Sequence, residues 1–196
     1  MNKTILWVIL GVCLFLGATW IGSTYNAFVK LDEKVIADWA QVENQYKRRL
    51  DLIPNLVETV KGYAAHEKET LAQVVALRSA AQTAAKASDL LMNKDAMDNY
   101  IKAQSALSQG LGRLMVIVER YPDLKANEGF LALQSQLEGT ENRIAVERRN
   151  YIETVRKYNI KVRSFPSAII ASIFGFEKKQ IFDMPEEAGV SPKVNF

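Results

Sequence analysis

The sequence predicts an all-α protein, in which an N-terminal transmembrane helix precedes an antiparallel, up-and-down four-helix bundle. An uncharged apolar run opens the chain, and apolar residues then recur at helical spacing almost everywhere. No alternation of apolar and polar residues, which is typical of strands, competes with this pattern. Composition agrees, because Pro (5) and Gly (10) are scarce among the 196 residues and strong helix formers are abundant.

The uncharged run extends from Thr4 to Thr24. At about 1.5 Å per residue it spans roughly 30 Å, the thickness of a bilayer's hydrocarbon core. Trp7 and Trp20 lie near its two ends, where indole rings favour the headgroup region, so we expect them to anchor the span. A cleaved signal peptide is the main alternative, but the run is long for one and no clear cleavage site follows. We therefore predict a retained single-pass anchor over residues 1–24.

The orientation of this span depends on the lysines at its ends. Lys3 precedes it, whereas Lys30 and Lys34 follow, so the positive-inside rule hardly separates the two orientations. A start with a lysine and no acidic residue is typical of an uncleaved signal anchor. This favours a large domain outside the cytoplasm.

The bundle is expected over residues 25–164, in helices of about 25–50, 52–84, 94–121 and 124–164. Each helix carries an apolar stripe. The second stripe has a gap at Glu67 and Lys68, whereas the fourth is an uninterrupted seven-residue repeat, which favours shallow packing angles. The members of that repeat are Phe130, Leu137, Ile144, Tyr151 and Tyr158.

The ends of these helices have recognisable signals. The stretch 85–93 loses the periodicity, and Pro122 ends the third helix because the residue before a proline avoids the α conformation. Short polar side chains, which can accept hydrogen bonds from the N–H groups of a first turn, are candidate N-caps of the third and fourth helices. They are Ser88, Asp89, Asn93, Asp123 and Asn127.

Pro54 lies within the helical pattern of the bundle's first half. A proline costs about 3 kcal/mol or more in a helix interior, but almost nothing in the first turn. Asp51 is a suitable N-cap for a helix with Pro54 in its first turn. We therefore predict a break between Leu50 and Ile53. With a kinked continuous helix instead, there would be three long helices, and the segment after residue 165 would lie far from the membrane.

The predicted break would place two arginines at a helix end, where cations suit the helix dipole. These are Arg48 and Arg49, and together with Pro54 and Asn55 they would form the bundle's exposed apex, distant from the bilayer. We interpret this apex as a candidate surface for docking a protein partner.

Three stretches resemble the LemA family of bacterial membrane proteins: Tyr25–Glu67, Val118–Asn159 and SFPSAIIASIFGF at Ser164–Phe176. The resemblance covers nearly the whole chain. It implies an N-terminal transmembrane helix that carries a four-helix bundle, and it suggests the bacterial inner (cytoplasmic) membrane as the location. It implies no established biochemical activity and supplies no catalytic or binding residues.

The segment 165–182 is too apolar for a solvated tail and too short to span a membrane. Its apolar residues include Ile169, Ile170, Phe174 and Phe176. Three uses stay open: it caps the open end of the bundle, it lies among lipid headgroups as an amphipathic helix, or it docks a partner. Residues 183–196 are expected to form an extended tail.

Candidate chemical groups are few. His66 is the only histidine, with Glu69 the only carboxylate on a nearby helical face, which is weak support for a metal or general-base site. Glu141 and Arg148 fall on the apolar stripe of the fourth helix. We expect them to form an interhelical pair, for example with one of the two arginines near Pro54, that fixes the register of the bundle.

These observations favour a non-enzymatic membrane-anchored scaffold or adaptor, which binds protein partners or supports membrane organisation. No catalytic residue, cofactor or metal is predicted, and a homo-oligomer is left open. The 25 basic and 22 acidic residues are mixed along the chain, which argues against nucleic-acid binding. The alternative is an enzyme or a metal-binding bundle of unrecognised type, centred on His66.

Overall fold

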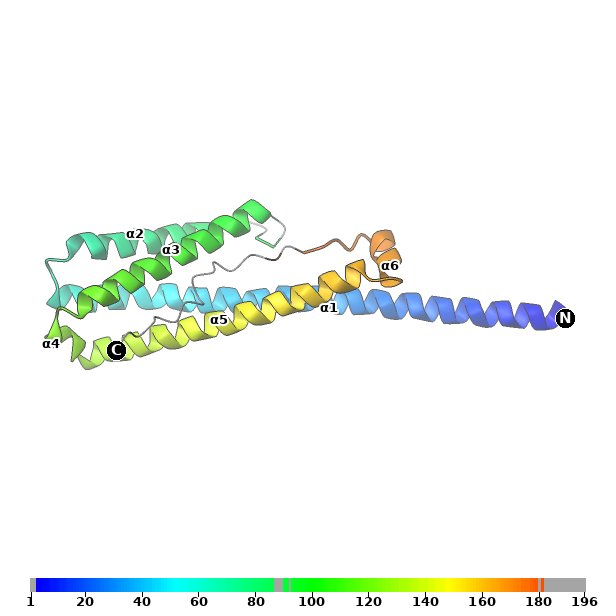
Figure 1. The fold of residues 1–196 in the computed structure, drawn as a ribbon, viewed down its shortest axis with the longest axis horizontal. Coiled ribbons are helices and arrows are strands. Elements are labelled where there is room, and N and C mark those ends of the chain that lie inside the picture. The colour runs from blue at the N-terminus through cyan, green and yellow to red at the C-terminus, as the bar shows by residue number, and fades with distance from the viewer. Residues whose placement is uncertain (1–2, 87–89, 92, 180, 182–196) are drawn as a thin grey trace, which may run out of the picture.

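The computed structural model describes residues 3–86, 90–91, 93–179 and 181. All regular structure within these residues is helical (Figure 1). The helices are α1 (Lys3–Tyr63), α2 (Lys68–Ala85), α3 (Lys94–Val118), α4 (Pro122–Lys125), α5 (Glu128–Arg163) and α6 (Ser167–Phe174). The long helices α1, α2, α3 and α5 alternate in direction (Figure 1), which confirms the predicted fold class.

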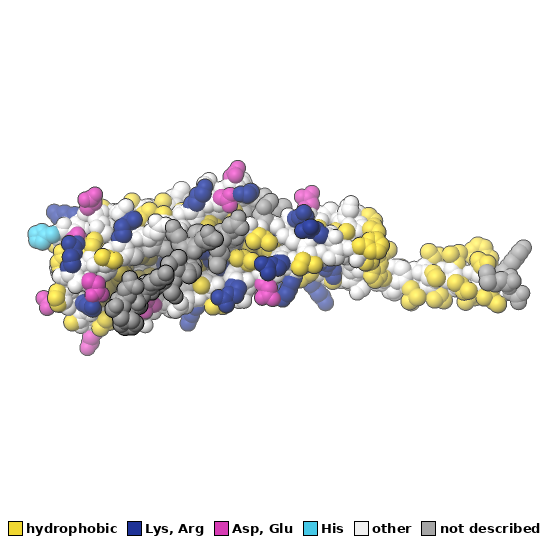
Figure 2. Space-filling view, in the orientation of Figure 1, with side chains coloured by type: hydrophobic (Ala, Val, Ile, Leu, Met, Phe, Trp, Pro, Cys, Tyr) yellow, Lys and Arg dark blue, Asp and Glu magenta, His cyan; other side chains and the backbone are white. Residues whose placement is uncertain are grey.

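Helix α1 combines the apolar run and the first bundle helix in 61 residues without interruption. Its N-terminal part is long and apolar enough to cross a bilayer, and that window packs against nothing else in the chain. Figure 2 shows it projecting from the bundle with an apolar surface. Trp7 is 72% exposed and Trp20 41% exposed, as expected of anchor residues that would face lipid.

The predicted break between Leu50 and Ile53 is wrong, because α1 continues through Pro54 to Tyr63. The exposed Pro54 has no N–H to donate to the carbonyl of Leu50, four residues earlier. That carbonyl instead accepts a hydrogen bond from Arg78 Nε on α2, at 2.9 Å. A donor from a neighbouring helix thus replaces the missing bond of α1.

The chain reverses later, between α1 and α2, at residues 64–67. The gap in the apolar stripe at Glu67 and Lys68 therefore falls at the junction between this turn and the start of α2. Because the turn moves rather than disappears, there are still four long helices, and α5 returns towards the membrane span (Figure 1). A continuous α1 thus does not send the segment after residue 165 to the far end of the bundle.

Two asparagines cap helices as predicted. The Asn93 side chain accepts a hydrogen bond from the Ala96 N–H, at 3.1 Å, and the Asn127 side chain accepts one from the Phe130 N–H, at 2.9 Å. Asp123 belongs to the short α4 instead. The candidate caps Ser88 and Asp89, and the predicted tail 183–196, lie outside the described residues.

Two hydrophobic clusters make up the core. The membrane-proximal cluster is rich in aromatic rings and contains Phe28, Val35, Trp39, Val42, Tyr46, Leu90, Met97, Tyr100, Ile101, Ile144, Tyr151, Val155, Tyr158, Ile170 and Ala171. The distal cluster is largely aliphatic and contains Leu50, Ile53, Leu56, Val57, Val60, Ala64, Leu71, Val74, Ala81, Leu107, Leu111, Leu114, Val118, Leu124, Phe130 and Leu137. All five members of the predicted seven-residue repeat are buried.

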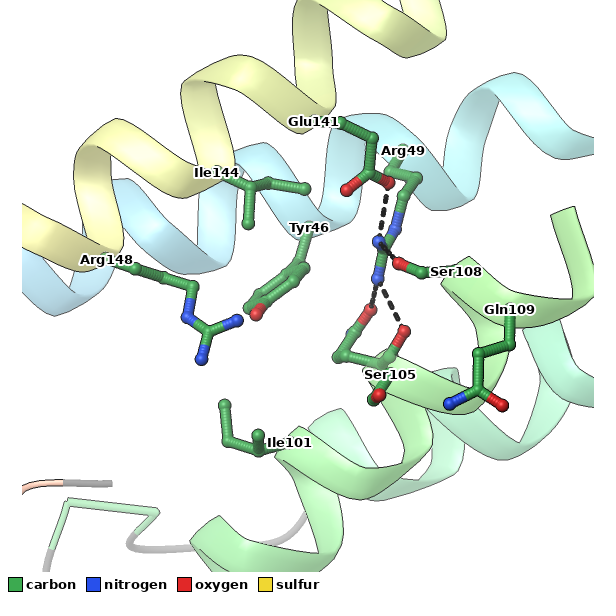
Figure 3. Close-up of a pocket in the computed structure, with 10 residues that line it drawn as sticks. Tyr46, Arg49, Ile101, Ser105, Ser108, Gln109, Glu141, Ile144 and Arg148 are labelled. Carbon is green, nitrogen blue, oxygen red and sulfur yellow. Dashed lines mark hydrogen bonds and ion pairs between the residues drawn. The ribbon is translucent and has the colours of Figure 1, made fainter. Parts of the chain in front are cut away.

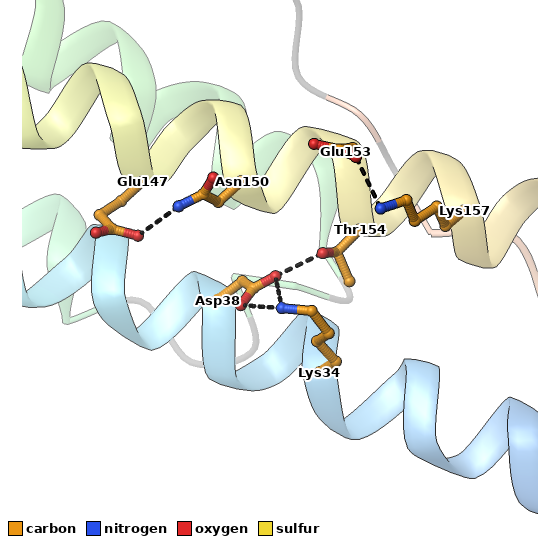
Figure 4. Close-up of polar contacts among 7 residues, drawn as sticks. All are labelled: Lys34, Asp38, Glu147, Asn150, Glu153, Thr154 and Lys157. Atoms are coloured by element: carbon orange, nitrogen blue, oxygen red, sulfur yellow. Dashed lines mark hydrogen bonds and ion pairs between the residues drawn. The ribbon is translucent and has the colours of Figure 1, made fainter.

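Helices α1 and α5 pack along each other, and a polar contact fixes their register (Figure 4). The buried Thr154 on α5 donates its hydroxyl to Asp38 Oδ2 on α1, at 2.6 Å. Asp38 also pairs with Lys34, at 2.9 Å, one turn earlier on α1. Helices α2 and α3 form a second packed pair, whereas α3 and α5 approach each other less closely. The bundle is therefore more open between α3 and α5.

Candidate functional site

A buried arginine links three helices in the middle of the bundle (Figure 3). Arg49 of α1 is only 1% exposed. Its Nη1 donates to Glu141 of α5, at 2.6 Å, and to the hydroxyl of Ser108 on α3. Its Nη2 donates to the carbonyl of Gln104 on α3, at 3.1 Å, and to the Gln104 side-chain oxygen. One guanidinium therefore fastens α3 and α5 to α1.

These polar side chains, called the polar layer below (Arg49, Gln104, Ser108 and Glu141), lie where the two core clusters meet. At this level, the buried residues of α1, α3 and α5 pass from the proximal cluster to the distal cluster. The flanking residues are Tyr46 and Leu50 on α1, Ile101 and Leu107 on α3, and Ile144 and Leu137 on α5. The polar layer thus divides the hydrophobic core in two.

The hydrogen bonds and the ion pair of Arg49 offset the free-energy cost of burying its charge. A guanidinium without partners in a protein interior costs several kcal/mol, whereas a paired and hydrogen-bonded one costs far less. The Glu141 side chain is 43% exposed, so the ion pair lies at the edge of the bundle rather than at its centre. The Tyr46 ring adds a cation–π contact, 5.1 Å from the guanidinium carbon.

A cavity of about 250 Å³ opens beside the polar layer, between α1, α3 and α5. Its lining residues are Tyr46, Arg49, Ile101, Gln104, Ser105, Ser108, Gln109, Glu141, Ile144 and Arg148. A second cavity of about 490 Å³ between α3 and α5 shares Ser108 and Glu141 with it. Solvent therefore approaches the polar layer from the side where α3 and α5 diverge.

Arg148 of α5 points into the first cavity, towards Tyr46 (Figure 3). Burial raises the pKa of the Tyr46 hydroxyl, and the positive charges of Arg148 and Arg49 oppose this rise. The phenol therefore stays protonated at neutral pH. Among the described residues, no ion-pair partner lies within range of Arg148.

The predicted interhelical pair is confirmed for Glu141, which pairs with Arg49. Arg49 itself is buried, so its assignment to an exposed docking surface was wrong. Arg48, Pro54 and Asn55 are exposed, but they lie along the side of α1 rather than at the apex, because the chain turns only after Tyr63. Partner docking by these three stays a prediction.

His66 lies exposed in the turn after α1, at the tip of the molecule (Figure 2). Glu141 is instead held by Arg49 in the polar layer, so the fold does not bring the histidine and this glutamate together. Across the described part of the chain, no group of three or more His, Cys, Asp or Glu side chains is placed to hold a metal ion.

Sequence reasoning missed Gln104, Ser108 and Arg78. A signal existed for Gln104, since it follows Tyr100 by four residues and precedes Leu107 by three, which places it on the apolar face of α3. A polar residue on such a face calls for a buried partner. No comparable signal marks Arg78, because its partner is a backbone carbonyl.

Helix α6 forms a second candidate surface, beside the base of the membrane span. Its inner face caps the bundle: Ile170 is buried, and the Phe176 ring that follows α6 stacks on Phe28, at 4.8 Å between centroids. Ile169 and Phe174 are about half exposed, at 52% and 49%. The Phe174 ring also contacts Tyr25 of α1, at 4.9 Å between centroids. One face therefore caps the bundle, while the other is apolar and exposed.

One ion pair and two hydrogen bonds hold the end of this segment. Lys179 pairs with Asp32 of α1, at 2.8 Å, and the Asn159 side chain of α5 exchanges two hydrogen bonds with the backbone of Lys179. The segment after α6 is thus tied to both α1 and α5, and its position relative to the membrane span is fixed.

Comparison with known proteins identifies a family and several relatives of this chain. Residues 38–196 match the LemA family. The chain is 27% identical to magnetosome protein MamQ 2 of Paramagnetospirillum magneticum, and 28% identical to magnetosome protein MamQ of Magnetospirillum gryphiswaldense; each match covers 87% of this chain and 68% of the relative. It is 25% identical to protein LemA of Metamycoplasma hominis, over 85% of this chain and 75% of the relative.

Proposed function

Because the chain belongs to the LemA family, we propose that it is a single-pass, non-enzymatic scaffold of the bacterial cytoplasmic membrane, with its bundle outside the cytoplasm. The observation that carries the proposal is the continuity of α1, which runs from the apolar span into the bundle core. No linker separates anchor and bundle, so the bundle stands on the membrane in a fixed direction. A rigid support for protein partners needs this property.

The exposed face of α6 supports the membrane side of the proposal. Phe165, Ile169, Ile173 and Phe174 are exposed apolar side chains beside the start of the bundle. In water this exposure is unfavourable, whereas the headgroup boundary of a bilayer accepts it. The capping face of α6 holds this apolar face in place, so α6 rests on the membrane surface as a second contact.

Photo-crosslinking in native membranes tests this arrangement. A photo-reactive residue at Phe174 is expected to form adducts with lipid, whereas one at the exposed Arg48, midway along the bundle, is not. Adducts with lipid at position 48 but not at 174 would refute the arrangement. A protein captured at position 48 would identify a partner of the scaffold.

Orientation is tested separately with a membrane-impermeant thiol reagent. The only cysteine, Cys13, is replaced by serine, and a cysteine is introduced at the exposed Ala65 beside the distal turn. We expect labelling of intact spheroplasts at this position. Labelling only after the membrane is disrupted would place the bundle in the cytoplasm and overturn this part of the proposal.

A further inference from the structure

The cavity beside the polar layer contains an excess of hydrogen-bond donors. Four buried side-chain N–H groups of its lining residues make no well-formed hydrogen bond in the described structure: Arg49 Nε, Gln104 Nε2, and Arg148 Nε and Nη2. The nearest polar groups are phenol oxygens, that of Tyr100 beside Gln104 and that of Tyr46 beside Arg148, and neither carries a charge. Two of these residues, Arg49 and Gln104, are no more than 2% exposed. The Gln104 amide orientation is set by the bond from Arg49 to its oxygen, which leaves the NH₂ group to face elsewhere. The cavity therefore lacks hydrogen-bond acceptors for these N–H groups.

The net charge of the cavity lining also favours a ligand that supplies acceptors, namely an anion. Two guanidinium groups, Arg49 and Arg148, line the cavity, against the single carboxylate of Glu141. Guanidinium groups stay protonated in proteins, so one positive charge remains uncompensated at neutral pH. An uncompensated charge that is partly removed from water is costly, and a bound anion removes that cost.

The size and walls of the cavity narrow the choice of anion. A volume of about 250 Å³ accommodates a molecule of several heavy atoms. Tyr46, Ile101 and Ile144 contribute apolar surface to the cavity, and Ser105 and Gln109, one and two turns after Ile101 on α3, contribute polar groups. A single negative charge balances the site, whereas a dianion would place excess negative charge beside Glu141. The planar guanidinium fork of Arg148 matches a carboxylate.

We propose that this cavity binds a small monocarboxylate with a short apolar body, whose carboxylate pairs with Arg148 and whose apolar part contacts Tyr46, Ile101 and Ile144. The bound molecule touches α1, α3 and α5 at once. It therefore joins α5 to α3 where the bundle is open, independently of whether the protein acts as a scaffold.

The test uses full-length protein in detergent micelles or nanodiscs. Sodium butyrate, sodium phosphate and sodium chloride are compared at equal ionic strength, by saturation-transfer NMR for butyrate and by thermal unfolding for all three. We expect saturable butyrate binding and a rise in the unfolding temperature beyond that in chloride. Absence of saturable binding, or a larger thermal shift with phosphate than with butyrate, would overturn the proposal.

Variants of two arginines on α5 separate binding from folding. Arg148→Gln is expected to weaken butyrate binding by about tenfold or more, because a charge-assisted bond is lost. Arg149→Gln, at the exposed neighbouring position, is the matched control and should bind like the wild type. Equal binding by wild type and Arg148→Gln contradicts the assigned site.

A third variant keeps the proposal testable if Arg148→Gln fails to fold. Glu141→Gln retains an oxygen that accepts from Arg49 but removes the negative charge. We expect tighter butyrate binding and a gain in phosphate binding, because the repulsion of anions disappears. Unchanged affinities for both anions would show that charge does not select the ligand and would overturn the proposal.

Discussion

The two halves of the bundle are held together by different kinds of side chain. In the membrane-proximal half, aromatic rings meet edge to face: Trp39 contacts Tyr100 and Tyr151 at 5.9 and 5.4 Å between centroids, and Tyr46 contacts Tyr100 at 5.6 Å. In the distal half, the buried members are aliphatic apart from Phe130. Aromatic pairs of this geometry add about 0.5–1.5 kcal/mol beyond area burial.

This difference affects how precisely the helices of each half are positioned against one another. Aliphatic cores tolerate sliding and repacking, whereas edge-to-face rings and hydroxyl groups require defined positions. The proximal half must align the bundle with the membrane span and with α6, and it contains the orienting side chains. The polar layer lies at the junction and fixes the register of one half against the other.

The largest expected effect is alkaline destabilisation of the proximal half. Burial raises the pKa of Tyr151 and of Tyr158 to about 12, and raises that of Tyr100 as well. The unfolded chain therefore ionises first, so stability is lost as pH rises above about 10. Linkage gives a loss of roughly 2 kcal/mol at pH 12 for each of Tyr151 and Tyr158.

Unfolding temperatures measured between pH 8 and pH 11.5 check this expectation. The double variant Tyr151→Phe, Tyr158→Phe should lose less stability over that range than the wild type. Tyr63→Phe, at an exposed position near the distal turn, should keep the wild-type slope. Identical slopes for all three proteins would mean that the proximal tyrosines do not dominate alkaline unfolding.

Removing the central arginine of the polar layer should have the next largest effect on stability. Arg49→Ala leaves the Gln104 carbonyl and Glu141 without their buried partner and opens a void, so we expect a loss of about 3 kcal/mol in the free energy of unfolding. Arg48→Ala, at the exposed neighbour, should change it by no more than about 0.5 kcal/mol. Denaturant unfolding measures both, and similar losses for the two variants would contradict a structural role of the polar layer.

The proline of the distal half offers a more local test. Arg78→Ala leaves the Leu50 carbonyl without a partner and should cost about 1–2 kcal/mol. In a Pro54→Ala background, the restored N–H can take over this carbonyl, so the same substitution should cost about 1 kcal/mol less. A double-mutant cycle by denaturant unfolding measures this coupling. Simple additivity of the two substitutions would show that Arg78 does not compensate for Pro54.

Replacing either of two glycines of α3 by alanine should have the smallest effect on stability. A Cβ added at Gly112 meets nothing within 4 Å, so Gly112→Ala should stabilise the protein by up to about 1 kcal/mol through helix propensity. A Cβ at Gly110 would lie 2.6 Å from Leu77 Cδ1 on α2. Gly110→Ala should therefore gain less, or lose stability, in thermal unfolding. An equal gain at both positions would show that α2 shifts easily against α3.

The outcome at Pro54 shows what sequence periodicity can and cannot predict. The apolar stripes depend only on residues within one helix, and those of α1, α3 and α5 agree with the buried residues. The fate of Pro54 depends on Arg78, which is 24 residues away and approaches only after α2 has folded back. Local rules favoured a break there because they cannot include a donor from another helix.

Arg49 shows the same limit in the polar layer. Read along α1 alone, it is one of two adjacent arginines suited to a helix end. Glu141 and Arg148 on the apolar stripe of α5 indicated that a buried polar partner existed, and Arg49, three residues after Tyr46 and four before Ile53, continues the buried stripe of an unbroken α1. The predicted break interrupted that stripe, and only the packing of α1, α3 and α5 shows which side chains Arg49 joins.

The unbroken α1 acts as a lever arm. From Tyr25 to Tyr63 it rises about 57 Å at 1.5 Å per residue, so the distal turn stands roughly that far above the base of the span. A tilt of about 20°, ordinary for a transmembrane helix, displaces this tip sideways by roughly 20 Å. Because packing and interfacial anchors set the tilt of such a helix, small changes in the contacts of α6 at the base of the span would be amplified into large displacements of the tip.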